Sequence, residues 1–133
     1  MIVLDELLSL LRQDNTLMAL LNVERDENNE IIDDKIYPLN TEFKGDCIVY
    51  TYTPLIADET TEQGRFEVNI ISEDMFKALE ILEQVKKCLI TFGDELKTEH
   101  IFEISQNGGS TPTQSDIGTY HVFGFFSVKN YKY

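Results

Sequence analysis

Residues 63–89 read QGRFEVNIISEDMFKALEILEQVKKCL, and this stretch decides the fold. Its first part alternates apolar Phe66, Val68 and Ile70 with polar neighbours, which is the period-two pattern of a strand with one buried face. After Ser72 the apolar residues recur at helical spacing, so the pattern predicts an amphipathic helix from Ser72 to Leu89. The stripe expected to face the core consists of Met75, Ala78, Leu79, Leu82, Val85 and Leu89.

The start of this helix has its own chemical signals. Ser72 is the predicted N-cap, and Glu73 and Asp74 follow it in the first turn, where negative charge stabilises the exposed N–H groups. Burying the six stripe residues contributes roughly 10 kcal/mol, at about 1.5–3 kcal/mol for each large apolar side chain. Because no other segment offers as much, we expect the core to be this helix lying across a sheet.

The remaining segments predict an α+β fold in a single domain of residues 1–133, with an antiparallel or mixed sheet of about four main strands. One long helix packs on a face of that sheet, and the spacing of Leu4, Leu7, Leu8 and Leu11 adds an N-terminal helix. A shorter helical stripe follows near Leu17. Strands are expected at residues 35–38, 47–53, 101–104 and 120–128 besides the one before the long helix. The last of them is apolar on both faces, so it is either central in the sheet or covered by another molecule.

Three polar segments are expected to connect these elements. Residues 24–34 have no periodicity and read as a mobile acidic loop, residues 54–63 are either a hairpin arm or a loop, and residues 110–119 read as a flexible loop. Asp26 would begin a calcium-binding loop, but Ile31 stands where such a loop needs glycine and Tyr37 where it needs glutamate. We therefore expect no tight calcium binding. Gly93 is the predicted stop of the long helix.

The net charge of the chain argues against two classes of partner, nucleic acids and anionic membranes. Eleven basic and 24 acidic side chains give a net charge of −13, which disfavours a nucleic-acid surface and an anionic membrane surface. No apolar run is long enough to span a bilayer, and the first residues lack the basic start of a signal peptide. Cys47 and Cys88 have no metal-binding spacing, so buried free thiols are expected. These features favour a protein made and kept in the cytoplasm.

Motifs for catalysis are missing from the sequence. It contains no nucleophile elbow, no phosphate-binding glycine loop and no zinc-protease helix. His100 and His121 border separate strands, and their spacing predicts structural or exposed roles. The expectation is therefore a protein that is not an enzyme and that needs no metal or cofactor.

The order of elements resembles that of the tail terminator, or tail completion, proteins of long-tailed bacteriophages and prophages. The resemblance covers the chain from about Leu4 to Tyr131. It is carried by Ile36-Tyr37-Pro38-Leu39, by Ile48-Val49-Tyr50, by the junction Phe66-Glu67-Val68-Asn69-Ile70-Ile71-Ser72-Glu73-Asp74, by the helix built on Ala78, Ile81, Val85 and Leu89, and by Gly118-Thr119-Tyr120 leading to Phe125-Phe126-Ser127-Val128. The acidic segment 24–34 departs from the family, which often has a short basic or neutral connection there.

The resemblance implies a virion assembly protein at the tail end of the head–tail junction, assembled in the host cytoplasm. Such proteins form a hexameric ring on the tail-tube protein, stop tube growth and present the surface for the head-completion (connector) protein, while DNA passes through without specific binding. The residues expected to contact partners lie in the two long polar segments: Asp58, Glu59, Thr60, Glu62, Gln114 and Asp116. The alternative is a cytoplasmic small-molecule-binding or regulatory domain whose helices cover a pocket.

Overall fold

The fold is built around a long strand that leads directly into the longest helix. The computed structural model describes residues 2–38, 46–90, 98–110, 112–114 and 118–132. Its helices are α1 (Ile2–Arg12), α2 (Asn15–Leu21) and α3 (Met75–Leu89). Its strands are β1 (Glu24–Arg25), β2 (Ile31–Asp33), β3 (Ile36–Pro38), β4 (Cys47–Ala57), β5 (Thr61–Ser72), β6 (Ile101–Gly109), β7 (Thr113–Gln114) and β8 (Tyr120–Tyr131).

The main sheet is mixed and has the order β3-β4-β5-β8-β6, with β7 pairing beside β8. β3 runs parallel to β4, and every other pair in this sheet is antiparallel. β8 is central between β5 and β6, but its two faces differ: Val122 and Phe126 are buried, whereas Phe123 and Phe125 on the other face are half-buried. The predicted α+β class with four main strands is therefore confirmed, because β4, β5, β6 and β8 are the long ones.

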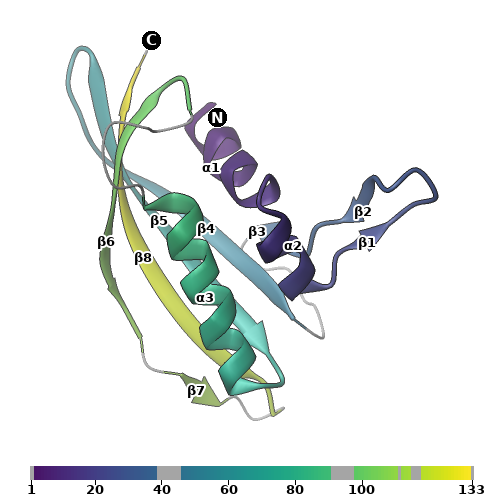
Figure 1. The fold of residues 1–133 in the computed structure, drawn as a ribbon. Helices are drawn as coiled ribbons and strands as arrows, with labels where there is room; N and C mark the ends of the chain where they lie inside the picture. The colour runs from purple at the N-terminus through teal and green to yellow at the C-terminus, as the bar shows by residue number, and fades with distance from the viewer. Residues whose placement is uncertain (1, 39–45, 91–97, 111, 115–117, 133) are drawn as a thin grey trace.

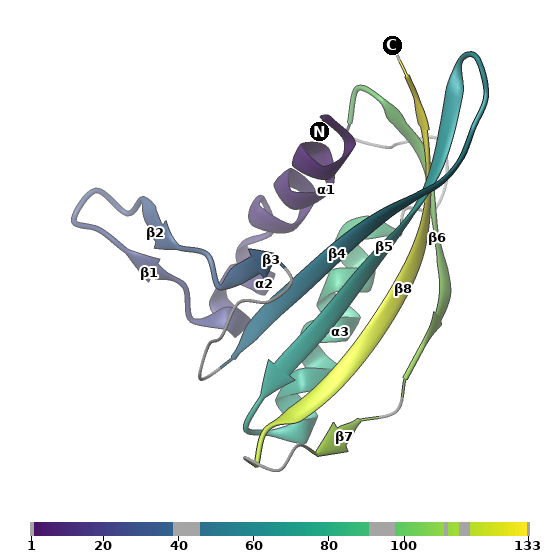
Figure 2. The same cartoon turned by 180° about the vertical axis from the view of Figure 1, so that it is seen from behind.

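All three helices lie on one face of the main sheet and leave the other face without a helix (Figures 1 and 2). α3 packs against β5 and β8, while α1 and α2 pack against α3. Leu82 reaches Gly124 of β8, where a side chain larger than hydrogen would meet it. The α3 residues buried in this core are Ala78, Ile81, Leu82, Val85 and Leu89. Met75 and Leu79, predicted to face the core, are only half-buried.

The predicted N-cap of the long helix was wrong. α3 begins at Met75 and its N-cap is Asp74, whose carboxylate accepts the N–H of Phe76 at 2.9 Å. Ser72 is instead the last residue of β5. It is fully buried, donates a hydrogen bond to Asp46 and accepts the N–H of Asp74 at 3.1 Å. The strand runs further than predicted because this hydroxyl holds the turn between strand and helix. The predicted stop at Gly93 lies outside the described residues.

The sequence had suggested a mobile loop for the acidic segment 24–34, and the structure shows paired strands there instead. β1 and β2 form a two-stranded antiparallel ribbon that projects from the body of the protein (Figure 1). The Asp26 carboxylate holds its turn by accepting the N–H groups of Asn28 and Glu30, both at 2.9 Å. An ion pair between Arg12 of α1 and Asp34 ties the base of the ribbon to the body. No helix among the described residues is long and apolar enough to cross a membrane.

Candidate assembly surfaces

The clearest projecting feature of the main sheet is the hairpin of β4 and β5. The two strands continue beyond the helices and form an arm, residues 54–63, at one end of the molecule (Figure 1). Sequence had left open whether this segment is an arm or a loop. Pro54 does not end β4. Among the described residues, only β3 pairs with the outer side of β4, at residues 48–50, so no described strand requires an N–H donor from Pro54.

Asp58 holds the turn at the tip of the arm. Its carboxylate accepts the N–H groups of Thr60 at 2.9 Å and Thr61 at 2.7 Å, and the Thr61 hydroxyl at 3.0 Å. The N–H of Thr61 is the main reason why the pKa of Asp58 lies below its usual value. The backbone N–H of Lys132 also donates to the carbonyl of Thr60 at 2.9 Å, which ties the end of the described chain to the arm.

The predicted contact residues do not form one surface. Asp58, Glu59, Thr60 and Glu62 lie at the tip of the arm, and the Asp58 side chain is already engaged within its own turn. Gln114 lies on β7 at the opposite end of the sheet (Figure 1), where it pairs with Tyr120 in a segment predicted to be only a flexible loop. Asp116 lies outside the described residues. The prediction that these residues contact partners stays a prediction.

Exposed apolar residues surround the arm, and they were not predicted as contact residues. Leu55 and Ile56 on the arm, and Phe102 and Tyr131 beside it, are large apolar side chains exposed to solvent. The rings of Phe102 and Tyr131 pack with their centroids 4.7 Å apart. Ile56 and Phe102 also line a shallow hollow of about 190 Å³ together with Gln63 and Lys129. The uncharged run TYTPLIA, residues 51–57, was the sequence signal for this surface.

The face of the sheet without helices is polar and aromatic. The Arg65 guanidinium lies 4.5 Å from the ring centroid of Phe125, and its Nε is 3.1 Å from a carboxylate oxygen of Glu67. Further along the same face, the Asn69 amide and the His121 ring nitrogen Nδ1 are 3.2 Å apart. The Arg65 charge is therefore compensated on the face itself, which lowers its attraction for phosphate.

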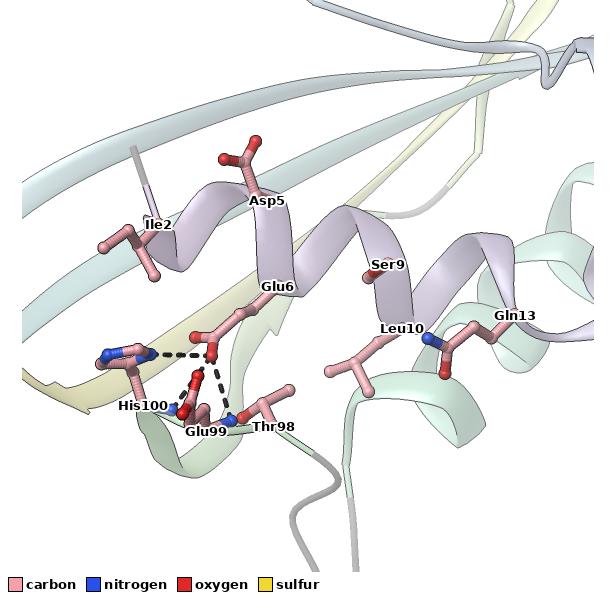
Figure 3. Close-up of a pocket in the computed structure, with 9 residues that line it drawn as sticks. All are labelled: Ile2, Asp5, Glu6, Ser9, Leu10, Gln13, Thr98, Glu99 and His100. Atoms are coloured by element: carbon pink, nitrogen blue, oxygen red, sulfur yellow. Dashed lines mark hydrogen bonds and ion pairs between the residues drawn. The ribbon is translucent and has the colours of Figure 1, made fainter.

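A second hollow, of about 350 Å³, lies between α1 and residues 98–100 (Figure 3). Its lining includes Asp5, Glu6 and Glu99. One oxygen of Glu6 accepts hydrogen bonds from the N–H groups of Glu99 and His100 and lies near His100 Nδ1, each at 3.0 Å. Glu6 thereby anchors the start of β6 to α1. Among the described residues, no group of three metal-binding side chains is found.

No protein-family model and no curated protein matches this sequence. One solved structure that does match contains a chain of the virion of a native gene transfer agent particle. The two chains share a fold. They align with a TM-score of 0.66 at 11% identity, over 94% of this chain and 91% of that chain. At this identity the likeness establishes the fold alone, and it extends over nearly the whole of both chains.

Proposed function

We propose that this protein is a tail terminator, a structural protein that caps the tail tube, stops its growth and forms the head–tail joining surface. It would act as a ring, taken to be hexameric, between the tail-tube protein and the head-completion protein of a phage or prophage. The observation that carries the proposal is the fold shared over 94% of the chain with a component of a gene transfer agent virion. The resemblance of the sequence motifs to tail terminators supports the more specific role.

The geometry supports action by assembly rather than by catalysis. The arm and the β1–β2 ribbon project from the body in different directions (Figure 1), and both carry exposed apolar residues. An isolated two-stranded ribbon is only marginally stable in water, so contacts with a neighbouring molecule would stabilise it. A head-to-tail ring gives each projecting element a neighbour.

The net charge of −13 suits a ring through which DNA passes. Like charge repels phosphate, so DNA is expected to slide through without specific binding. In this proposal the protein is found in the virion at the tail end of the head–tail junction, and in the host cytoplasm during assembly.

The direct test is deletion of the gene from its phage or prophage, followed by electron microscopy of the particles. We expect overlong tubes, or tails that fail to join heads, and complementation by the wild-type gene should restore normal particles. Tails of normal length joined to heads in the deletion strain would refute the terminator assignment.

The alternative is a small-molecule-binding or regulatory domain, and the hollow beside Glu6 is the observation that favours it. Its volume of about 350 Å³ is large enough for a small ligand. Two carboxylates besides Glu6 line it, so the ligand would be cationic. Equilibrium binding of polyamines or amino-acid amides that disappears in Asp5→Asn would support this function, whereas a ring-sized particle without such binding would favour the terminator.

A further inference from the structure

Besides the outer edge of the short strand β3, two strand edges in the main sheet lack a strand partner among the described residues. β3 covers β4 only at residues 48–50, so the outer edge of β4 from Thr51 to Ala57 is open in the described part of the chain. At the other end of the sheet, β6 pairs with β8 on one side and with no described strand on the other. An open edge presents unpaired backbone N–H and C=O groups to solvent.

The two open edges lie at the same level of the sheet. Following the register across β5 and β8, Ile56 is level with Gln63, Lys129 and Glu103, and Thr53 is level with Arg65, Ser127 and Ser105. The open part of β4 therefore spans the same level as residues 101–106 of β6. β4 and β6 run in opposite directions because three antiparallel pairings separate them. If β6 of one molecule lay beside β4 of the next, the pair would be antiparallel.

The composition of both edges favours pairing. Proteins commonly protect open edges with charged side chains, especially lysine, or with proline and bulges. The β4 edge has Pro54 and a bulge beside it, but neither β4 nor β6 contains a lysine. β4 contains no charged residue from Cys47 to Ala57, and β6 contains only Glu103, whose carboxylate lies 3.2 Å from the Lys129 ammonium. In a chain of net charge −13, two copies could approach through these edges without setting unpaired carboxylates against each other. Pro54 removes one donor, so the ladder would be interrupted at that residue.

Exposed apolar residues lie at matching places on the two edges. Ile56 is 68% exposed on the β4 side, and Phe102, next to Glu103 in a bulge of β6, is 39% exposed. A neighbour added at the same level would bring these side chains together and remove them from water. The occupant that fits the β4 edge is thus the β6 edge of a second copy of this chain.

We propose that copies of this protein join head to tail, the open edge of β4 in one copy pairing with β6 of the next, so that the main sheet continues from molecule to molecule. The inference rests on the proposed function, since it specifies how the ring would be built. Head-to-tail contacts of one kind close into a ring when the rotation per copy permits. Closure would also cover the open edges of β4 and β6 in every copy.

Edge-blocking variants test this proposal. Ile56→Lys places a lysine on the β4 edge and Phe102→Lys places one on the β6 edge. Phe76→Lys on α3 is the control for both, since Phe76 is 70% exposed and lies on no strand edge. Sedimentation velocity of the whole chain measures assembly over a range of concentrations, and circular dichroism confirms that each variant is folded.

We expect each edge variant to raise the dissociation constant of self-association at least ~100-fold, and the Phe76→Lys control to change it by less than about threefold. Mixing the two edge variants should give a one-to-one dimer and nothing larger, because one retains β6 and the other retains β4. An edge variant that assembles like wild type, or a mixture that stays monomeric, would overturn the proposal.

A cysteine pair gives a second measurement. Thr53→Cys and Ser105→Cys, at the same level of the sheet, should form intermolecular disulfides in a ladder of oligomers under oxidation, on tail-tube ends or at high concentration. Absence of the ladder in both conditions would overturn edge pairing. Tails still terminated normally by the edge variants would refute edge pairing and leave the terminator function intact. Normal tails in the gene deletion would refute the function itself.

Discussion

The contact between Leu82 and Gly124 predicts a specific coupling between α3 and the sheet. Leu82 is only 6% exposed, and its Cδ1 lies 2.8 Å from the position that a Cβ on Gly124 would occupy. Leu82→Ala removes three carbons from this contact. At about 0.8 kcal/mol for each carbon, with a further cost for the cavity, we expect a loss of about 3–4 kcal/mol in the free energy of unfolding. Leu79→Ala, on the same helix but half-buried, should cost about 1 kcal/mol.

The partner variant Gly124→Ala should also destabilise the protein. Its new methyl group would lie 2.8 Å from Leu82, 3.2 Å from Phe126 and 3.3 Å from Val68, which is tighter than ordinary contact. Such overpacking costs about 1–3 kcal/mol. When Leu82 is alanine, the nearest obstacle is gone and the added methyl fills part of the cavity. The double variant should therefore be at least about 1 kcal/mol more stable than the sum of the two single changes predicts.

Urea unfolding of the wild type, Leu82→Ala, Gly124→Ala and the double variant, followed by circular dichroism and fitted as two-state, measures this coupling, and Leu79→Ala is measured in the same way. If the two changes add within about 0.5 kcal/mol, Leu82 and Gly124 do not share a contact in solution. A cost below about 1 kcal/mol for Leu82→Ala would further show that α3 is not the centre of the core.

Three other predictions follow from the structure. Gly64→Ala should cost about 1–3 kcal/mol in the same titration, because its Cβ would come within 2.0 Å of the Tyr52 hydroxyl oxygen; a cost below about 0.5 kcal/mol would show that the ring moves aside freely. Burial, with the Asp46 charge second, raises the pKa of the Cys47 thiol to about 11, while an unfolded thiol titrates near pH 8.5–9, so the unfolded chain releases this proton first and stability should fall between about pH 9 and 11. The urea midpoint should therefore drop less from pH 8 to pH 10 in Cys47→Ala than in wild type, and equal drops would contradict this. Finally, calorimetry should detect no micromolar calcium binding to the β1–β2 ribbon; binding that disappears in Asp26→Ala would refute that prediction.

Local patterns in the sequence predicted most of the fold because the long helix and the main strands each carry a clear period. The change from alternation to helical spacing near Ser72 located both β5 and α3, although the helix begins at Met75. The predictions failed in segments where a side-chain carboxylate accepts backbone N–H groups and thereby holds a turn. Asp26 and Asp58 both organise tight turns in segments that lack periodicity, so a ribbon and an arm stand where a loop was predicted or left open.

The candidate site was less predictable because it depends on pairing between distant segments. The polarity of residues 54–63 suggested Asp58 and Glu62 as partner contacts. The Asp58 carboxylate, however, accepts hydrogen bonds within its own turn. Ile56 on β4 and Phe102 on β6 lie at the same level along the strands. The pairing of β4 with β5, of β5 with β8 and of β8 with β6 sets that level. The uncharged run 51–57 marks Ile56 in the sequence, but nothing local marks Phe102 as lying at the same level, because that level follows from the register of three strand pairs. Periodicity within one strand carries no information about that register.

The distribution of charge reconciles self-association with a strongly acidic chain. Copies that each carry a net charge of −13 repel one another at a distance, and salt weakens this repulsion at separations beyond roughly 10 Å. Close contact needs surfaces without unpaired carboxylates, and the edge of β4 is uncharged while the single charge of β6 is paired. Repulsion would then oppose contacts elsewhere on the surface and leave the edges as the route to assembly. In the proposed ring, the same acidic charge that limits how copies meet would also keep DNA from adhering.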